Sequence, residues 1–550
     1  MRYSFPPPDP GTAPMWAKHL ILPAAVVVAL LALRASLFPL DSKARHIAFD
    51  PGPAAADDFA AVVARVDESF RQNWAEKGLA PAPRAADLLV ARRLSLGLTG
   101  TVPSLEEIRQ FEAQPAAGRL EGWANHLLHD RRFADFFADR LSRAYLGSED
   151  GPLVVYRKRR FLAWLSDQLL ANRPYGEAVR DMIASTGLNT STPAVNFIAA
   201  AYDEEKQKAD PEKLAIRVSR AFLGLRLDCA QCHDHFLEPT WKQTDFQALA
   251  AYFGQTRQVV TNVSDGDGEY RFEDRVNGGS VTIDPAVPFL AELLPTEGTR
   301  REKLAAWLTD RRNMHFARAA VNRVWAMLLG RPLRAKVEAQ TLDDPAPAAL
   351  DILAADFAAH GHDLRRLVLL IASTEVFRLD SASPDEITDD HEKAWVVFPL
   401  TRLRPEQVIG GVLQAASVKT IDRNSHVLVR LIRYASERDF VKRYGDPDDD
   451  DSAQAPGTLP QRLLLMNGEL VDKQAREDLV NASARIALLA PSDAAAVEAA
   501  YLAVLTRRPT EREASHFTAQ LSGVTGGDRQ RRLADLFWVL FNSTELSYNH

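Results

Sequence analysis

Residues 122–146, GWANHLLHDRRFADFFADRLSRAYL, decide the fold class of this chain. Their apolar positions recur every three or four residues, which is the period of an α-helix with one buried face. We therefore expect one or two amphipathic helices here. The same period extends outward through residues 88–98, 161–185 (with a break before Pro174) and 213–225. The chain from about residue 84 to 252 is predicted to be mainly helical.

The second half repeats the helical pattern. Helical periodicity is present in residues 301–310, 315–330, 350–360 and 365–379, and further helices are expected between 461 and 542. Two helix starts carry a capping box, in which a hydroxyl and a carboxylate three residues later bind backbone N–H groups. The boxes are Pro103-Ser104-x-x-Glu107 and Pro509-Thr510-x-x-Glu513.

Residues 256–284 follow a different pattern. They alternate and contain Asp-Gly and Asn-Gly-Gly turns, which indicate short β-hairpins. Asp265-Gly266-Asp267-Gly268-Glu269 resembles part of a calcium loop but lacks its length, so a hairpin turn is favoured. We expect a mainly α fold in which two helical domains, 57–254 and 299–550, flank a small β-hairpin insert at 255–298.

A long apolar run lies near the N-terminus. Leu20–Leu33 is unbroken and, with Ala35–Leu40, reaches about one bilayer thickness. Arg34 stands where a cleavage site needs a small residue. We expect an n-region at 1–18, an uncleaved signal anchor forming one membrane segment at 19–40, and a linker at 41–56. The remaining chain would then lie on the periplasmic or extracytoplasmic face of a bacterial envelope, or be secreted if the segment is cleaved.

Composition narrows the function classes. The 550 residues are 46% hydrophobic and 25% charged, as in ordinary globular proteins. The net charge of −7 argues against nucleic acid as a partner. The chain contains no Walker A, G-x-S-x-G, H-E-x-x-H or Rossmann glycine pattern. Without such a motif, no catalytic residue can be selected from the sequence. Whether the protein is an enzyme stays open.

The only two cysteines lie in one motif, Cys229-Ala230-Gln231-Cys232-His233. C-x-x-C-H is the pattern that attaches c-type haem. The thiols of Cys229 and Cys232 would bond to the haem vinyl groups, and His233 would be the proximal iron ligand. For the sixth ligand the sequence offers, unranked, Met182, Met314, Met327, Met466, His315 and His362. Four aromatic residues after the motif could form the walls of a haem crevice or pack in the protein core. They are Trp241, Phe246, Tyr252 and Phe253.

Two other chemistries fit the same motif. His235 follows two residues after His233, so Cys229, Cys232, His233 and His235 could hold zinc or another transition metal. Alternatively, the two cysteines could form a disulfide or a redox-active dithiol.

Several motif blocks together resemble a known family. They are Arg92–Gly100 followed by Pro103-Ser104-x-x-Glu107, Asn172–Tyr175, Phe222–Gly224 leading into Cys229–His235, Trp241–Phe246, Ala320–Trp325, Leu403-x-Pro405-Glu406-Gln407, Leu464–Gly468 and Arg508–Glu513. The sequence is similar, over roughly residues 60–545, to planctomycete secreted proteins in which a cytochrome-type (PSCyt) domain precedes a planctomycete-specific C-terminal (PSD) domain. Both domains are of unknown function. Where that family usually has proline after Cys-x-x-Cys-His-Asp-His, this chain has Phe236.

These observations lead to two functional hypotheses. The first is a membrane-anchored extracytoplasmic redox or electron-transfer component that carries haem c and passes electrons to a redox partner protein. The second is a non-redox cell-envelope interaction protein, or a metal-dependent enzyme, in which the Cys/His cluster binds metal or forms a disulfide. The sequence specifies neither a substrate nor an oligomeric state.

Overall fold

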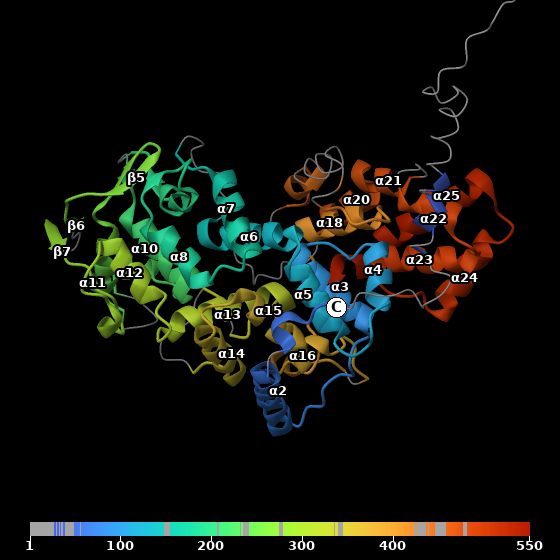
Figure 1. Cartoon of the computed structure of the whole chain (residues 1–550), viewed down its shortest axis with the longest axis horizontal. Helices are drawn as coiled ribbons and strands as arrows, with labels where there is room; N and C mark the ends of the chain where they lie inside the picture. Colours follow the sequence, from blue (N-terminus) through green and yellow to red (C-terminus); the bar gives the residue numbers. More distant parts are fainter. Residues whose placement is uncertain are drawn as a thin grey trace, which may run out of the picture.

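The structure of the protein is a computed structural model. It describes residues 27–28, 30–31, 33–34, 37–38, 49–55, 57–147, 155–205, 208–231, 233–234, 241–273, 279–334, 336–338, 345–384, 386–422, 425, 436–437, 439–445, 458–476 and 481–550. The chain is mainly helical, with small antiparallel sheets. Figure 1 shows the β-hairpins at one end of an elongated molecule and the last helices at the other end.

The predicted helical character of residues 84–252 is confirmed. The stretch 122–146 forms two helices, because the Asp130 carboxylate accepts a hydrogen bond from the Arg132 amide at 2.8 Å and starts a new helix. The helices of this half are α2 (Asp57–Lys77), α3 (Asp87–Thr99), α4 (Leu105–Glu112), α5 (Arg119–Leu128), α6 (Arg131–Leu146), α7 (Lys158–Leu170), α8 (Tyr175–Ala184), α9 (Asn196–Ala199), α10 (Pro211–Val218) and α11 (Gln243–Ala250).

The second half is helical as predicted, and both capping boxes are formed. The stretch 365–379 is divided, because the Thr374 hydroxyl accepts from the Phe377 amide and caps a new turn. The helices are α12 (Arg300–Leu308), α13 (Met314–Leu329), α14 (Ala348–Ala359), α15 (Leu364–Ser373), α16 (Glu375–Arg378), α17 (Asp389–Lys393), α18 (Pro405–Ala415), α20 (Leu459–Asn467), α21 (Glu469–Ala475), α22 (Ala482–Leu489), α23 (Asp493–Leu505), α24 (Glu511–Leu521) and α25 (Gly526–Phe541).

The predicted hairpins are also present. β4 (Thr256–Val259) pairs with β5 (Asn262–Asp265), and β6 (Tyr270–Glu273) pairs with β7 (Ser280–Ile283). A strand from the first half, β1 (Gly187–Leu188), extends the first hairpin to three strands. Arg301 of α12, only 1% exposed, binds Asp265 at 2.7 Å and the Ile183 carbonyl at 2.9 Å. The insert is therefore joined to both helical halves.

The buried apolar residues form two clusters that cross the middle of the chain. The first extends from Phe59 to Phe398. The second joins Leu96, Val102, Leu105 and Ile108 to the apolar faces of the last helices. α3 contributes to both clusters, since Leu94 and Leu98 belong to the first and Leu96 to the second. Each cluster thus depends on residues from both halves of the sequence.

Two adjacent arginines of α3 fix the end of the chain. Arg92 and Arg93 are 0% exposed. Arg92 donates to the carbonyl groups of Glu545 and Tyr548 at 3.2 and 3.3 Å, and Arg93 donates to that of His550 at 2.7 Å. Burial lowers the pKa of Arg92 to about 10 and that of Arg93 to about 9, so both remain charged at neutral pH. In Figure 1 the C-terminus lies beside α3 at the centre of the molecule.

Short strands and turns complete the fold. β8 (Thr401–Arg402) pairs with β9 (Tyr548–Asn549), and β2 (Tyr202–Asp203) pairs with β3 (Lys208–Ala209). The 3-10 turns are η1 (Gly52–Ala55), η2 (Pro193–Val195), η4 (Asp228–Gln231), η5 (Ala251–Phe253), η6 (Ala291–Leu293) and η7 (Glu545–Ser547), and η3 (Ser219–Leu223) is a π-helical turn.

The predicted n-region at 1–18 and most of the predicted anchor at 19–40 lie outside the described residues. Within 19–40 the described positions include Leu37, which is buried in the second cluster. Among the residues that the structure describes, none of the helices combines the length and the apolar character needed to cross a membrane.

Candidate functional site

The Cys229–Gln231 part of the predicted motif forms the 3-10 turn η4, which follows α10 and η3. Gly224 ends η3 with a φ of 68°, a backbone conformation that favours glycine. Ala230 is fully buried, whereas Cys229 is exposed and its thiol is free. The turn therefore seats its middle residue in the core and presents the first cysteine to solvent.

A polar network behind the turn holds it in place. Gln231 donates through Nε2 to the Glu212 carboxylate at 2.6 Å. Tyr270 donates to Oε1 of Gln247 at 2.6 Å and lies 3.2 Å from Glu212 Oε1. Burial, with a contribution from Glu212, raises the pKa of Tyr270, so the phenol keeps its proton. The network connects α10, α11 and β6 to the motif and limits its movement.

The His233 side chain has a defined tautomer. Its ring is exposed, and Nδ1 lies 2.7 Å from the Asp234 carbonyl oxygen. Because a carbonyl oxygen can only accept, Nδ1 carries the proton and the neutral ring keeps a lone pair on Nε2. Asp234 is itself held, since its carboxylate accepts from the Gln243 amide at 2.9 Å. Histidines that ligate metals commonly have this arrangement, with one ring nitrogen bound to a carbonyl and the other free.

The other two predicted ligands, Cys232 and His235, lie outside the described residues. The structure therefore brings Cys229 and His233 to one exposed segment and leaves the remaining pair as a prediction. In chemical terms, thiols and imidazoles in this order fit both covalent haem attachment and a transition-metal ion.

The four aromatic residues that follow the motif pack in the core. Trp241, Phe246, Tyr252 and Phe253 are at most 3% exposed and belong to the first cluster. Their side chains are covered by the core in the described part of the structure. Of the residues considered for a sixth iron ligand, Met182 and Met327 are also buried in that cluster, and Met466 is exposed.

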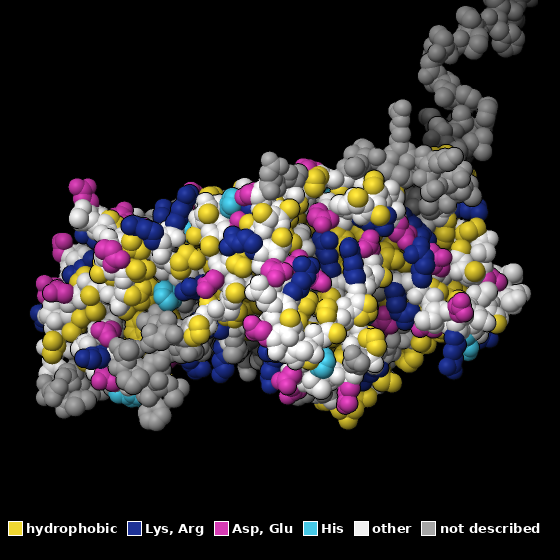
Figure 2. Space-filling model, turned by 90° about the horizontal axis from the view of Figure 1, so that it is seen from below, with side chains coloured by type: hydrophobic (Ala, Val, Ile, Leu, Met, Phe, Trp, Pro, Cys, Tyr) yellow, Lys and Arg dark blue, Asp and Glu magenta, His cyan; other side chains and the backbone are white. Residues whose placement is uncertain are grey.

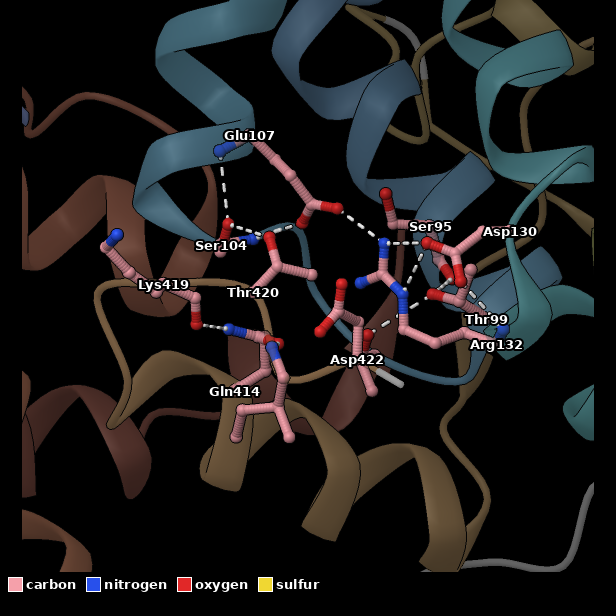
Figure 3. Close-up of polar contacts among 12 residues, drawn as sticks. Ser95, Thr99, Ser104, Glu107, Asp130, Arg132, Gln414, Lys419, Thr420 and Asp422 are labelled. Carbon is pink, nitrogen blue, oxygen red and sulfur yellow. Dashed lines mark hydrogen bonds and ion pairs between the residues drawn. The ribbon is translucent and has the colours of Figure 1, made fainter. Parts of the chain in front are cut away.

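A second polar cluster, which sequence reasoning did not find, joins the two halves. We call Ser104, Glu107, Asp130, Arg132 and Thr420 the polar joint (Figure 3). Arg132 contacts Glu107 at 2.5 Å and Asp130 at 2.7 Å, with the Arg132 and Glu107 side chains only 8% and 5% exposed. Ser104 and Thr420 share a hydrogen bond of 2.8 Å between their hydroxyl groups.

In the polar joint, Arg132 and Asp130 each stabilise the charged form of the other. These two groups therefore stay ionised and are unsuited to proton transfer. Burial disfavours the Arg132 cation, but Glu107 and Asp130 outweigh this effect and raise its pKa. Although burial opposes ionisation of Asp130, its contacts with Arg132 lower its pKa. The only sequence signal for this joint was the capping box at Ser104 and Glu107. The partners Arg132 and Thr420 come from distant segments that local patterns do not connect.

A third cluster places Asp58, Asp356 and His360 close enough to share a metal ion. Arg366 already occupies the carboxylates, donating to both oxygens of Asp356 at 2.9 Å and to Asp58 at 2.8 Å. His360 Nε2 lies 3.0 Å from Asp58. A cation added here would have to displace a guanidinium from a nearly buried bidentate pair. We therefore interpret this cluster as a clasp in which Arg366 of α15 joins α2 to α14.

On the face of the molecule shown in Figure 2, positive and negative side chains are mixed in the part that the structure describes. Attraction of a charged ligand to this face would therefore depend on particular groups more than on a broad field of one sign.

The fold and site define an α-helical protein of two interlocked halves with an exposed Cys/His segment. Residues 65–258 match the family model PSCyt2, a protein of unknown function (DUF1549), and residues 300–521 match PSD1, a protein of unknown function (DUF1553). The chain belongs to the family that combines these two domains. Comparisons with curated proteins and with solved structures found no match.

Proposed function

We propose that the protein is an extracytoplasmic redox component whose Cys229–His233 segment carries a covalently attached haem of the c type. The observation that carries this proposal is the geometry of His233. Its Nδ1 is engaged by the Asp234 carbonyl, so its exposed Nε2 is ready to ligate iron. Cys229, four residues earlier in the chain, offers an exposed free thiol that a haem vinyl group could reach.

When bound, the haem would supply one-electron chemistry. The residues of the chain would attach and orient it. Cys229 and Cys232 would hold one edge, and Asp234 would fix the His233 ring. The Glu212–Gln247–Tyr270 network would keep the attachment turn from moving. An exposed group of this kind suits exchange of electrons with a partner protein.

The second candidate is a bare metal ion, zinc or another transition metal, held by Cys229, Cys232, His233 and His235. The observation in its favour is that Trp241, Phe246, Tyr252 and Phe253 are packed in the core. A metal ion needs only its donor atoms, whereas a haem benefits from apolar walls. Under this reading the protein would be a non-redox envelope protein or a metal-dependent enzyme.

The decisive experiment is export of the full chain together with a cytochrome c maturation system. We expect a Soret band that survives denaturation, and a haem mass on the peptide containing Cys229 and Cys232. Cys229→Ser should remove one of the two thioether links, and His233→Ala should abolish the native iron ligation. His516→Ala, which changes an exposed histidine of α24, is the matched control and should have no effect.

His235→Ala separates the two candidates. Haem attachment should survive this change, whereas a four-ligand metal site should lose its ion in elemental analysis. An apoprotein without covalent haem, obtained while a control cytochrome matures normally, would exclude the leading proposal. Bound zinc that His235→Ala removes would then establish the second candidate.

A further inference from the structure

A cleft of about 460 Å³ lies where the two family domains meet, apart from the Cys229–His233 segment. Its walls are the first turns of α8, the turn 309–312 between α12 and α13, and the turn 361–362 between α14 and α15. The α8 wall lies in the first domain, and both turns lie in the second. A ligand in this cleft would touch both domains at once.

The positive charge of the cleft exceeds its negative charge. Arg312 is neutralised by two hydrogen bonds of 3.0 Å to Asp310, and Glu177 is neutralised by Arg173 at 3.1 Å. Arg180 and Arg311 form no ion pair with a carboxylate in the described part of the chain, although the charge of Arg180 contributes to lowering the pKa of Asp310. Arg180 is held in place, because its Nε donates to the Thr309 hydroxyl at 2.5 Å. Two guanidinium groups are therefore left to attract an anion.

The start of α8 adds to this attraction. Backbone N–H groups in the first turn of a helix carry a partial positive charge. In α8 the Tyr175 amide donates to the His362 carbonyl at 3.0 Å and the Glu177 amide to the Pro174 carbonyl at 2.9 Å, so Gly176 supplies the amide that can face a ligand. Gly176 lies in this turn, and a Cβ built on it would come within 2.6 Å of Nδ1 of His362. A glycine at this position lets the helix start approach the histidine ring closely.

His362 brings a buried imidazole to the same place. The side chain is 5% exposed, and its ring packs 5.1 Å from those of Phe316 and Phe357. Its Nε2 has no hydrogen-bond partner among the residues that the structure describes. Gly361 and His362 have φ angles of 69° and 64°, so two consecutive residues adopt the left-handed conformation. For a residue other than glycine this conformation is costly, and such residues concentrate at functional sites.

We propose that this cleft binds an oxyanion group of a larger ligand, with Arg180 and Arg311 as its principal contacts. Guanidinium groups bind phosphate, sulfate and carboxylate through paired, charge-assisted hydrogen bonds. The Gly176 amide at the start of α8 and the neutral ring of His362 provide uncharged donors alongside them. The cleft volume leaves room for an anion that is a substituent of a larger molecule.

Binding is measured on the full chain with inorganic phosphate, sulfate and acetate as probes, each titrated against sodium chloride at matched ionic strength. Thermal unfolding and calorimetry report the stabilisation and the dissociation constant. We expect at least one probe to bind the wild-type chain beyond the chloride effect. The double variant Arg180→Gln/Arg311→Gln should weaken that binding by at least about tenfold.

Two controls make the outcome unambiguous. Arg65→Gln removes an exposed arginine of α2 and should bind as the wild type does. Arg180→Lys/Arg311→Lys keeps the charge and should retain part of the affinity. Preference for phosphate and sulfate, or for acetate, assigns a tetrahedral or a carboxylate ligand. The proposal is overturned if no probe exceeds chloride, or if the double glutamine variant binds as tightly as Arg65→Gln.

Discussion

His362 combines burial with a left-handed backbone and a ring nitrogen, Nε2, that has no hydrogen-bond partner in the described part of the chain. Burial, with the nearby charges of Arg311 and Arg180, lowers the pKa of His362 to about 4. Its ordinary value is about 6.5. The native ring therefore stays neutral at pH values at which the ring in an unfolded chain becomes protonated.

This difference predicts a loss of stability in acid. Above pH 6.5 the ring is neutral in both states and has no effect. Between pH 6.5 and about 4 only the unfolded chain binds the proton, so the free energy of unfolding falls as the pH falls. His362→Asn removes this contribution, and asparagine tolerates the left-handed conformation. From pH 7 to 4 the wild type should lose up to about 3 kcal/mol relative to His362→Asn.

Urea denaturation of both proteins across this pH range tests the prediction. His315, whose pKa is also lowered to about 4, is present in both proteins, so its effect cancels in the comparison. His516→Asn is the matched control and should follow the wild type. A constant difference between wild type and His362→Asn at all pH values would contradict the prediction.

At the scale of elements, the two capping boxes form a natural comparison. Ser104 and Glu107 start α4 inside the molecule, where Ser104 also binds Thr420 from the other half. Thr510 and Glu513 start α24 at the surface with the same backbone bonds. The local motif is the same, and the tertiary surroundings differ.

We therefore expect unequal costs from equivalent substitutions. Thr510→Ala should lower the free energy of unfolding by about 1 kcal/mol, the usual value of a cap. Ser104→Ala should cost about 2 kcal/mol, because a buried hydrogen bond to Thr420 is lost as well. Chemical denaturation of the two variants measures the difference. If both variants lost the same free energy of unfolding, the hydrogen bond between Ser104 and Thr420 would make no contribution beyond that of the helix cap.

Local elements of the fold could be predicted from the sequence, whereas long-range contacts could not. The helices and hairpins were predictable, because periodicity, capping residues and Asp-Gly turns act within a few positions. Cys229 and His233 were selected from their spacing alone; both are exposed in the structure, and their role as a site stays a prediction. The partners that hold the molecule together were not found. Glu107 meets Arg132 across 25 positions and Ser104 meets Thr420 across 316, and no local pattern encodes such distances.

At the scale of the whole molecule, the family domains and the apolar cores do not coincide. The matched domains end and begin near residues 258 and 300, whereas each cluster of buried residues draws on both sides of this boundary. α3 and α4 supply part of the core of the C-terminal helices. The two domains are therefore interdependent in this structure.

Separate expression tests this interdependence. Residues 57–298 and 299–550, produced alone, should be poorly soluble or lack a cooperative unfolding transition, because each exposes apolar surface that the other normally covers. The full chain should unfold in one transition. Calorimetry and circular dichroism measure both. A cooperative transition in either isolated half would contradict the expectation.

The hydrogen bonds from Arg92 and Arg93 to the last residues also constrain the order in which the chain can fold. A ribosome makes Arg92 453 residues before its acceptor Glu545. At typical elongation rates this separation lasts about 20 to 90 s. During that time α3 cannot close without burying the Arg92 cation away from its carbonyl partners, which is costly. Arg93 has two acceptors that are made earlier, the carbonyl groups of Phe377 and Leu379. The nascent chain must keep this helix accessible to water until residues 545–550 emerge, so the central core is completed after translation of those residues and not progressively during synthesis.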